Sequence, residues 1–181
     1  MTAQTIVRKQ RITRDLILDC ARELLKTNGV KSISIRRIAE VIPCAPPSIY
    51  YYFRNKQAII EALMVEPIDQ LMQTLKQQQA NSSDPLEFVM AYATHWLNRP
   101  DQLRLLLLPT VGVSDSILAS SHYTQIELRL ALLLGGDELK AEALLGAVNG
   151  MLLKLLQHPS GLNKHSEERI RNYMLTLLGS R

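Results

Sequence analysis

Apolar residues recur at helical spacing along much of the chain, which predicts an all-α protein. The first such segment begins at Thr13, with Asp15 in its first turn, and ends at Asn28-Gly29, a pair typical of helix ends. Its apolar stripe consists of Ile17, Cys20, Ala21, Leu24 and Leu25. Residues 1–12 carry three basic side chains and little that could be buried, so we expect a flexible basic arm there.

Two short helices are predicted between residues 34 and 54. Their apolar faces are formed by Ile35, Ile38, Ala39 and Ile42 in the first helix and by Ile49 and Phe53 in the second. A tight turn near Pro43 separates them, and a third, longer helix begins after Asn55. This order predicts a helix-turn-helix, whose second helix can enter the major groove of DNA.

Three cations lie where helix electrostatics disfavours them. Arg36 and Arg37 fall in the first turn of a helix capped by Ser34, and Lys56 directly follows Asn55, the expected cap of the next helix. A helix N-terminus carries a partial positive charge, so cations there are unfavourable unless an anion is also present. We interpret the three as phosphate contacts. The alternative is that they are solvated surface charges.

The same residues resemble the signature of a known family. Residues 34–39 (SIRRIA), 47–53 (PSIYYYF) and 55–60 (NKQAII) are similar to TetR-type transcriptional regulators, over about the first 60 residues. The resemblance implies a homodimer that binds double-stranded operator DNA, with repression as the default. It also implies a variable, all-helical C-terminal domain that binds a small-molecule effector.

The resemblance implies roles for particular residues of the N-terminal DNA-binding domain. The predicted DNA-binding residues are Arg36, Arg37, Pro46, Pro47, Ser48, Tyr50, Tyr51, Tyr52 and Lys56. We expect Arg36 to reach a base edge or a phosphate, and the other cations and Tyr50 to contact phosphates. We expect the hydroxyls of Tyr51 and Tyr52 to bond to phosphates too. Because prolines offer bases only apolar contact, we expect shape readout to carry much of the specificity.

Two positions depart from the family pattern. Pro43 stands where the family usually has glycine, and Ala45 stands where it often has a capping serine. Proline fixes φ near −65°, so a turn that needs positive φ cannot form there unchanged. Alanine is a poor cap. We therefore expect a distorted turn and a helix that begins at Pro47, with Pro46 as a non-helical lead-in.

The charge of the chain is uneven. Residues 1–60 hold 11 Lys and Arg against 4 Asp and Glu, a balance of +7, whereas the remainder holds 10 against 13, a balance of −3. A basic N-terminal part followed by a mildly acidic remainder is typical of a nucleic-acid-binding domain joined to a domain that does not contact the nucleic acid. Cys20 and Cys44 are predicted to be reduced core residues. With neither a signal peptide nor an apolar run of about 20 residues, we expect a cytoplasmic protein that does not enter the membrane.

We predict a domain boundary at residue 56, with the DNA-binding domain at 13–56 and a ligand-binding and dimerisation domain at 57–181. A long helix from Asn55 toward Gln79 leads into this body, and Pro67 should kink or break it. The further predicted helices span 85–98, 101–108, 114–134, 137–157 and 166–178.

The helices of the body offer two candidate surfaces. Aromatic, Met and His side chains at helical spacing suggest a pocket for an apolar or aromatic effector, with ordinary core packing as the alternative. Its candidate residues are Met64, Ile68, Met72, Phe88, Tyr92, His95, Trp96 and His122. The last two helices look too apolar for a monomer, so we expect a dimer interface there. Its candidate residues are Ala143, Ala147, Gly150, Met151, Tyr173, Met174 and Leu177.

An enzyme is not predicted. The chain has no phosphate-cradling glycine loop, no nucleophile elbow and no metal-ligand spacing, and its four histidines are widely separated. We expect no catalytic residue, cofactor or metal. The competing hypothesis is an all-helical protein–protein interaction module whose degenerate head binds no DNA, as the departures at Pro43 and Ala45 would suggest.

Overall fold

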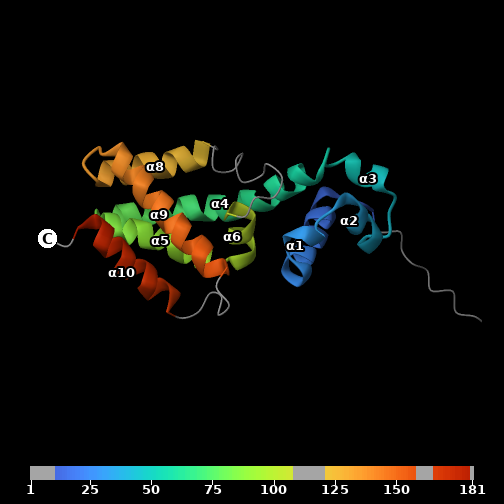
Figure 1. Ribbon diagram of the computed structural model, residues 1–181. Helices are drawn as coiled ribbons and strands as arrows, with labels where there is room; N and C mark the ends of the chain where they lie inside the picture. Colours follow the sequence, from blue (N-terminus) through green and yellow to red (C-terminus); the bar gives the residue numbers. More distant parts are fainter. Residues whose placement is uncertain (1–10, 108–120, 158–164, 180–181) are drawn as a thin grey trace, which may run out of the picture. The chain divides into compact units, whose positions relative to one another are not determined.

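The structure is a computed structural model that describes residues 11–107, 121–157 and 165–179, and every regular element in those ranges is a helix (Figure 1). The predicted all-α class is confirmed. The chain divides into two compact units, one within residues 1–59 and one within 60–181. Most of the expected basic arm and the first residues of the helix expected at 114–134 lie outside the described ranges.

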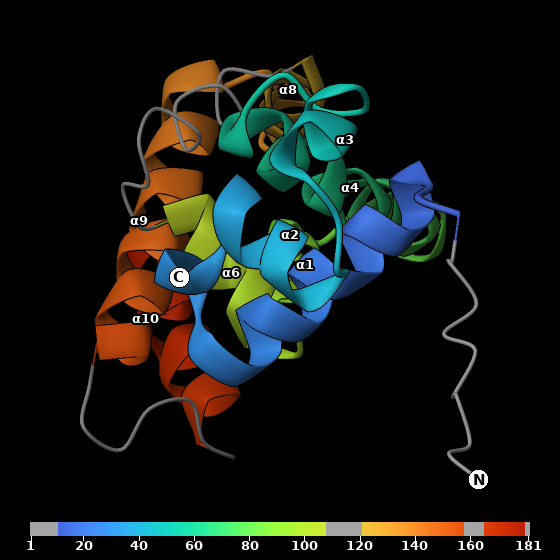
Figure 2. The same cartoon turned by 90° about the vertical axis from the view of Figure 1, so that its right-hand side faces the viewer.

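The N-terminal unit is a small helical domain (Figure 2). It contains α1 (Arg14–Asn28), the 3-10 turn η1 (Val30–Ser32), α2 (Ile35–Val41) and α3 (Pro46–Tyr50). Thr13 caps α1, because its hydroxyl accepts a hydrogen bond from the backbone of Leu16 at 3.2 Å. Gly29 ends α1 with a φ of 71°, a conformation that side chains disfavour. The boundaries predicted for this helix are confirmed.

The helices of this unit pack through a shared set of buried side chains. Ile17 and Ala21 of α1, Ile38 of α2 and Ile49 of α3 are fully buried, and Phe53 is 3% exposed. α2 contacts both α1 and α3. Cys20 is only partly buried, although it was expected in the core. Leu18, 4% exposed, is buried together with the other four residues of the predicted stripe, so the inward face of α1 is rotated slightly toward Leu18.

The turn between α2 and α3 forms without glycine. Cys44 donates its backbone N–H to the carbonyl of Ala39 at 3.0 Å. This is the longer of the two bonds that close a Schellman-type helix end. The shorter one would need an N–H at Pro43, which proline lacks. The turn therefore keeps half of the usual hydrogen bonding.

α3 begins at Pro46, one residue earlier than predicted. Ala45 is extended, with φ −76° and ψ 139°, and supplies no side-chain cap. Its carbonyl instead accepts a hydrogen bond from Ser48 N–H at 2.9 Å. Two consecutive prolines occupy the first turn, where missing N–H groups cost little because they would be unpaired anyway.

α4 (Lys56–Asn81) starts in the first unit and continues into the second. Asn55 caps it, since its side-chain oxygen accepts a hydrogen bond from Ala58 N–H at 2.8 Å. Pro67 was predicted to kink or break the helix, and the helix is continuous through it, so no break occurs. Pro67 is buried, and its burial offsets the loss of the one backbone hydrogen bond that a proline cannot donate.

The C-terminal unit is built around α5 (Pro85–Leu97). This helix contacts α6 (Pro100–Leu107), α8 (Ser121–Leu133), α9 (Glu138–Gln157) and α10 (Ser166–Leu178). The sequence predicted one apolar stripe on α5, but almost its whole circumference is buried, including Phe88, Tyr92 and Trp96. A helix that is apolar all round belongs at the centre of a bundle. None of the described helices combines the length and apolar character needed to cross a membrane.

Candidate nucleic-acid interface

Most of the predicted DNA-binding residues lie on the solvent-exposed surfaces of α2 and α3. The side chain of Arg36 is 90% exposed and that of Arg37 is 56% exposed. Tyr50 and Tyr51 are 54% and 83% exposed, which is unusual for aromatic residues on so short a helix. Pro46 and Pro47 are exposed as well, whereas Ser48 is partly buried.

Both arginines of α2 already have a partner in the protein. Glu40 accepts a hydrogen bond from Arg36 Nε and another from an Arg37 terminal nitrogen, each at 3.2 Å. The bonds from Arg37 and then Arg36 lower the pKa of the Glu40 carboxyl. The inference that these cations need an external anion therefore overlooked Glu40, which lies four and three residues along the same helix. Exposed pairs of this kind are weak, so a phosphate can compete for the guanidinium groups.

Lys56 has a structural contact that the sequence did not reveal. Its ammonium donates to the carbonyl of Val30, 26 residues earlier, at 3.3 Å. Burial lowers the pKa of this ammonium. The contact ties the start of α4 to the corner between α1 and α2. Because an ammonium carries three donors, two remain for a phosphate.

Tyr52 differs from its prediction. Its hydroxyl donates to the carbonyl of Ile12 at 2.7 Å, and its ring meets Tyr51 edge to face with centroids 4.9 Å apart. A phenol has one proton to donate and a phosphate at neutral pH mainly accepts, so this hydroxyl cannot also donate to DNA. Tyr52 joins the end of α3 to the residues before α1, and Tyr51 and Tyr50 remain the exposed candidates.

The predicted effector residues are only partly brought together. Ile68, Tyr92, Trp96 and His122 line one small cavity of about 20 Å³, together with the unpredicted Leu71, Leu106, Tyr123 and Ile126. The other four candidates, Met64, Met72, Phe88 and His95, do not line it. A cavity of this size holds about one water molecule, and most of the aromatic stripe is packed core.

A polar chain adjoins this cavity. The hydroxyl of Tyr92 donates to the Asn149 side-chain oxygen at 2.8 Å, and the Asn149 amide donates to the hydroxyl of Tyr123 at 2.7 Å. Burial raises the pKa of Tyr92, and burial followed by the nearby Glu127 raises the pKa of Tyr123 to about 12. Both phenols are therefore neutral at physiological pH. No sequence pattern points to Asn149, which lies 57 residues from Tyr92.

The candidate dimer residues fall on two kinds of surface. Ala143 and Gly150 of α9 are exposed, and Tyr173 and Leu177 of α10 are each 41% exposed. Ala147 and Met151 are partly exposed. Met174 is a correction: it is fully buried inside its own chain, because it lies on the inward face of α10 with Ile170.

Comparison with known proteins agrees with this geometry. Residues 17–63 match the family model described as bacterial regulatory proteins, tetR family. The chain is 34% identical over 56 residues to the tetracycline repressor protein class D of Escherichia coli, covering 31% of this chain and 26% of that protein. It is 35% identical over 54 residues to the transcriptional regulator UidR of Escherichia coli strain K12, covering 30% and 28%. The chain thus spans about a quarter of the length of these curated relatives.

The fold of the whole described chain has relatives among solved structures. A transcriptional regulator from Aquifex aeolicus superposes with a TM-score of 0.65 at 15% identity, over 91% of this chain and 98% of that one. α1, α2 and α3 thus form a domain of the helix-turn-helix class. The family match over residues 17–63 confirms the TetR resemblance predicted for the first 60 residues.

Proposed function

We propose that this protein is a DNA-binding transcriptional regulator that docks α3 in the major groove and acts as a repressor. The exposed Arg36, Arg37, Tyr50 and Tyr51 around an intact helix-turn-helix are the observation that carries the proposal. Arg36 reads a base edge or a phosphate, and the remaining cations and tyrosines contact phosphates that set the docking angle. The intact backbone bond from Cys44 to Ala39 argues against a degenerate head.

A homodimer is part of the proposal, because a palindromic operator needs two recognition helices. The exposed small residues Ala143 and Gly150 on α9 allow close approach of a second copy, and a Cβ placed at Gly150 would point into open space among the described residues. Tyr173 and Leu177 of α10 supply exposed apolar surface. These residues support an interface made by the last two helices of each copy.

The effector in this proposal is a neutral apolar or aromatic molecule. The phenols of Tyr92 and Tyr123 and the amide of Asn149 are uncharged hydrogen-bonding groups beside an apolar cavity. Ligand sites usually measure about 300–1,000 Å³, far more than the cavity seen here. The effector therefore binds by opening this cavity, and the displaced helices carry the change toward α4.

Salt-dependent DNA binding is the first test. At low salt the full chain should bind a mixed-sequence duplex with two copies per bound site, as measured by fluorescence anisotropy and sedimentation. Two copies that each present three cations would make about six phosphate contacts, so the logarithm of affinity should fall with the logarithm of salt with a slope of about −5. An interaction module without a DNA-binding head would show no binding under these conditions.

Arg36→Ala should weaken binding to a selected genomic fragment by about 1–3 kcal/mol and blur its preference over random duplex. The fragment comes from selection on the organism's own DNA, and competition anisotropy measures the preference. Glu40→Gln is the matched counterpart: it frees both arginines and removes a carboxylate that repels phosphate. It should therefore tighten binding to every duplex. Equal losses on selected and random DNA for Arg36→Ala would rule out base reading.

A further inference from the structure

A groove of about 990 Å³ lies in the N-terminal unit between α1 and the turn that precedes α3. Its apolar lining consists of Ile12, Leu16, Leu24, Val41, Ile42 and Pro43. Val41 is 51% exposed there, so apolar surface is left open to solvent. The groove has the dimensions of a small-molecule site. Its lining residues all belong to the helix-turn-helix domain, whereas those of the cavity assigned to the effector belong to the C-terminal unit.

Both cysteines of the chain line this groove. Cys20 reaches it from α1 and Cys44 from the turn, and both are free thiols that are only partly buried. They are close enough to interact: burial raises the pKa of Cys20, the charge on Cys44 raises it further, and Arg37 opposes both. An inert structural cysteine is usually enclosed in the core. These two share one solvent-accessible apolar site instead.

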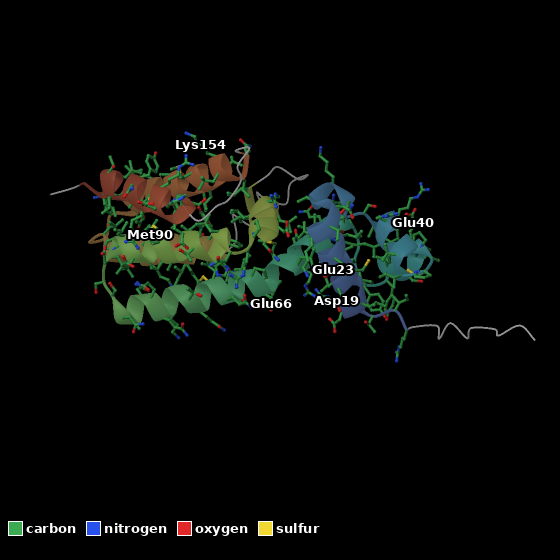
Figure 3. All side chains as sticks on the ribbon, turned by 90° about the horizontal axis from the view of Figure 1, so that it is seen from below. Asp19, Glu23, Glu40, Glu66, Met90 and Lys154 are labelled. Carbon is green, nitrogen blue, oxygen red and sulfur yellow. The ribbon has the colours of Figure 1, made fainter. Side chains whose placement is uncertain are left out.

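We propose that the pair of Cys20 and Cys44 is an oxidation site for neutral apolar hydroperoxides, and that the disulfide formed there weakens the docking of α3 on DNA. The predicted effect of the disulfide on DNA docking rests on the function proposed above. The apolar walls of the groove would hold the organic part of such a molecule. Asp19 and Glu23 of α1 also line the groove, and Figure 3 labels both on that helix. Because they are paired with Arg22 and Lys26, the apolar walls of the groove select the oxidant.

The reaction balances with one hydroperoxide. The Cys44 thiolate attacks the terminal oxygen, the O–O bond breaks, and the departing alkoxide takes a proton to leave as an alcohol. The sulfenic acid on Cys44 is then attacked by the sulfur of Cys20, the S–O bond breaks, and water leaves. The two thiols lose two electrons, which reduce the hydroperoxide. Burial raises the pKa of Cys20, so we assign that thiol the second step, the attack on the sulfenic acid.

The disulfide would act on α3 through the turn. A disulfide requires a narrow range of separation and dihedral angle between its two residues. Cys44 also supplies the backbone bond that closes α2, and it lies two residues before Pro46, where α3 begins. Bonding Cys44 to α1 therefore constrains the start of α3. Because phosphate contacts fix the register of the docked protein, we expect DNA affinity to fall about tenfold or more.

The test uses the full chain, reduced and then treated with cumene hydroperoxide or, in parallel, hydrogen peroxide. Intact mass should fall by two hydrogen atoms, and peptide mapping should join the peptides of Cys20 and Cys44. Cumene hydroperoxide should react faster than hydrogen peroxide. In C20S, a sulfenic acid on Cys44 should be trapped by dimedone with no disulfide formed. In C44S, Cys20 should remain mostly reduced. Circular dichroism checks that both variants keep their helices.

Duplex binding of the reduced, oxidised and re-reduced protein completes the experiment. Affinity should fall on oxidation, return with dithiothreitol, and stay unchanged in oxidised C20S. Separate sulfinic acids, bonds between chains, or equal rates with both peroxides would overturn the oxidation site. A cross-link without loss of DNA binding would overturn its regulatory effect. If the reduced protein bound no DNA, the proposed function would fail, while the mass result would still decide the oxidation site.

Discussion

Ile49→Ala should remove nearly all DNA binding while leaving the C-terminal unit folded. α3 has five residues and no side-chain cap, so it depends on tertiary packing for its position. Ile49 is its fully buried residue. Shortening a buried isoleucine to alanine costs about 2–5 kcal/mol, which a helix of this length cannot recover elsewhere. Anisotropy with a mixed-sequence duplex measures the loss.

The single tryptophan of the chain makes the two units separable in this experiment. Trp96 is 1% exposed at the centre of the C-terminal unit, so its fluorescence reports on that unit. Its thermal transition should be nearly the same in Ile49→Ala and in the unchanged protein. Tyr51→Ala, at the residue that directly follows α3, is the matched control, because that side chain is 83% exposed and contributes at most one phosphate contact. Wild-type binding by Ile49→Ala would mean that α3 is not the docking helix.

The helix ends of the N-terminal unit could be predicted from residues that are close together in the sequence. Thr13, Ser34 and Asn55 cap their helices through hydrogen bonds that span three residues, and Gly29 ends α1 with a positive φ. Each of these devices depends on a few neighbouring residues, so the sequence alone contains the information. The start of α3 was misplaced by one residue, because a proline disfavours but does not forbid the helical conformation in the residue before it.

Contacts between distant residues explain what the sequence could not show. Lys56 bonds to the carbonyl of Val30, and Tyr52 bonds to the carbonyl of Ile12, 40 residues earlier. Neither partner has a side-chain signature, because any residue offers a backbone carbonyl. Both side chains had been interpreted only as DNA contacts. The structure shows that part of the basic and aromatic surface also holds the head together.

The helical spacing of the apolar residues did not show how deeply each side chain is buried. It identified the apolar positions of α5 but could not show that nearly every side of that helix is covered, which leaves a cavity for one water where an effector pocket was predicted. It placed Cys20 with the core residues of α1, whereas a slight rotation of the inward face leaves this side chain at the groove. Such shifts depend on how neighbouring helices are rotated, which a periodic pattern does not specify.

Acid should destabilise the C-terminal unit through His95. This side chain is 6% exposed, and its Nε2 has no hydrogen-bond partner among the described residues. Burial, and then the positive charge of Arg99, lower the pKa of His95 from 6.5 to about 4. A backbone hydrogen bond at Pro67 acts in the opposite direction and raises this pKa. Folding thus favours the neutral imidazole. The stabilisation of the folded state by neutral His95 is complete above pH 6.5. It is lost as the pH falls toward 4, which lowers the free energy of unfolding by about 3 kcal/mol.

Thermal unfolding followed by Trp96 fluorescence between pH 7 and pH 4 measures this loss, because the His95 ring lies against Trp96 with centroids 4.9 Å apart. His95→Phe keeps an aromatic ring but cannot take a proton, so its stability should depend on pH less steeply by about 3 kcal/mol over this range. His165→Gln is the matched control, because it removes an exposed histidine. If His95→Phe lost as much stability in acid as the unchanged protein, protonation of other groups would be the cause. The backbone hydrogen bond at Pro67 favours the protonated ring, so the loss of stability in acid comes from the burial of the charge and from its repulsion by Arg99.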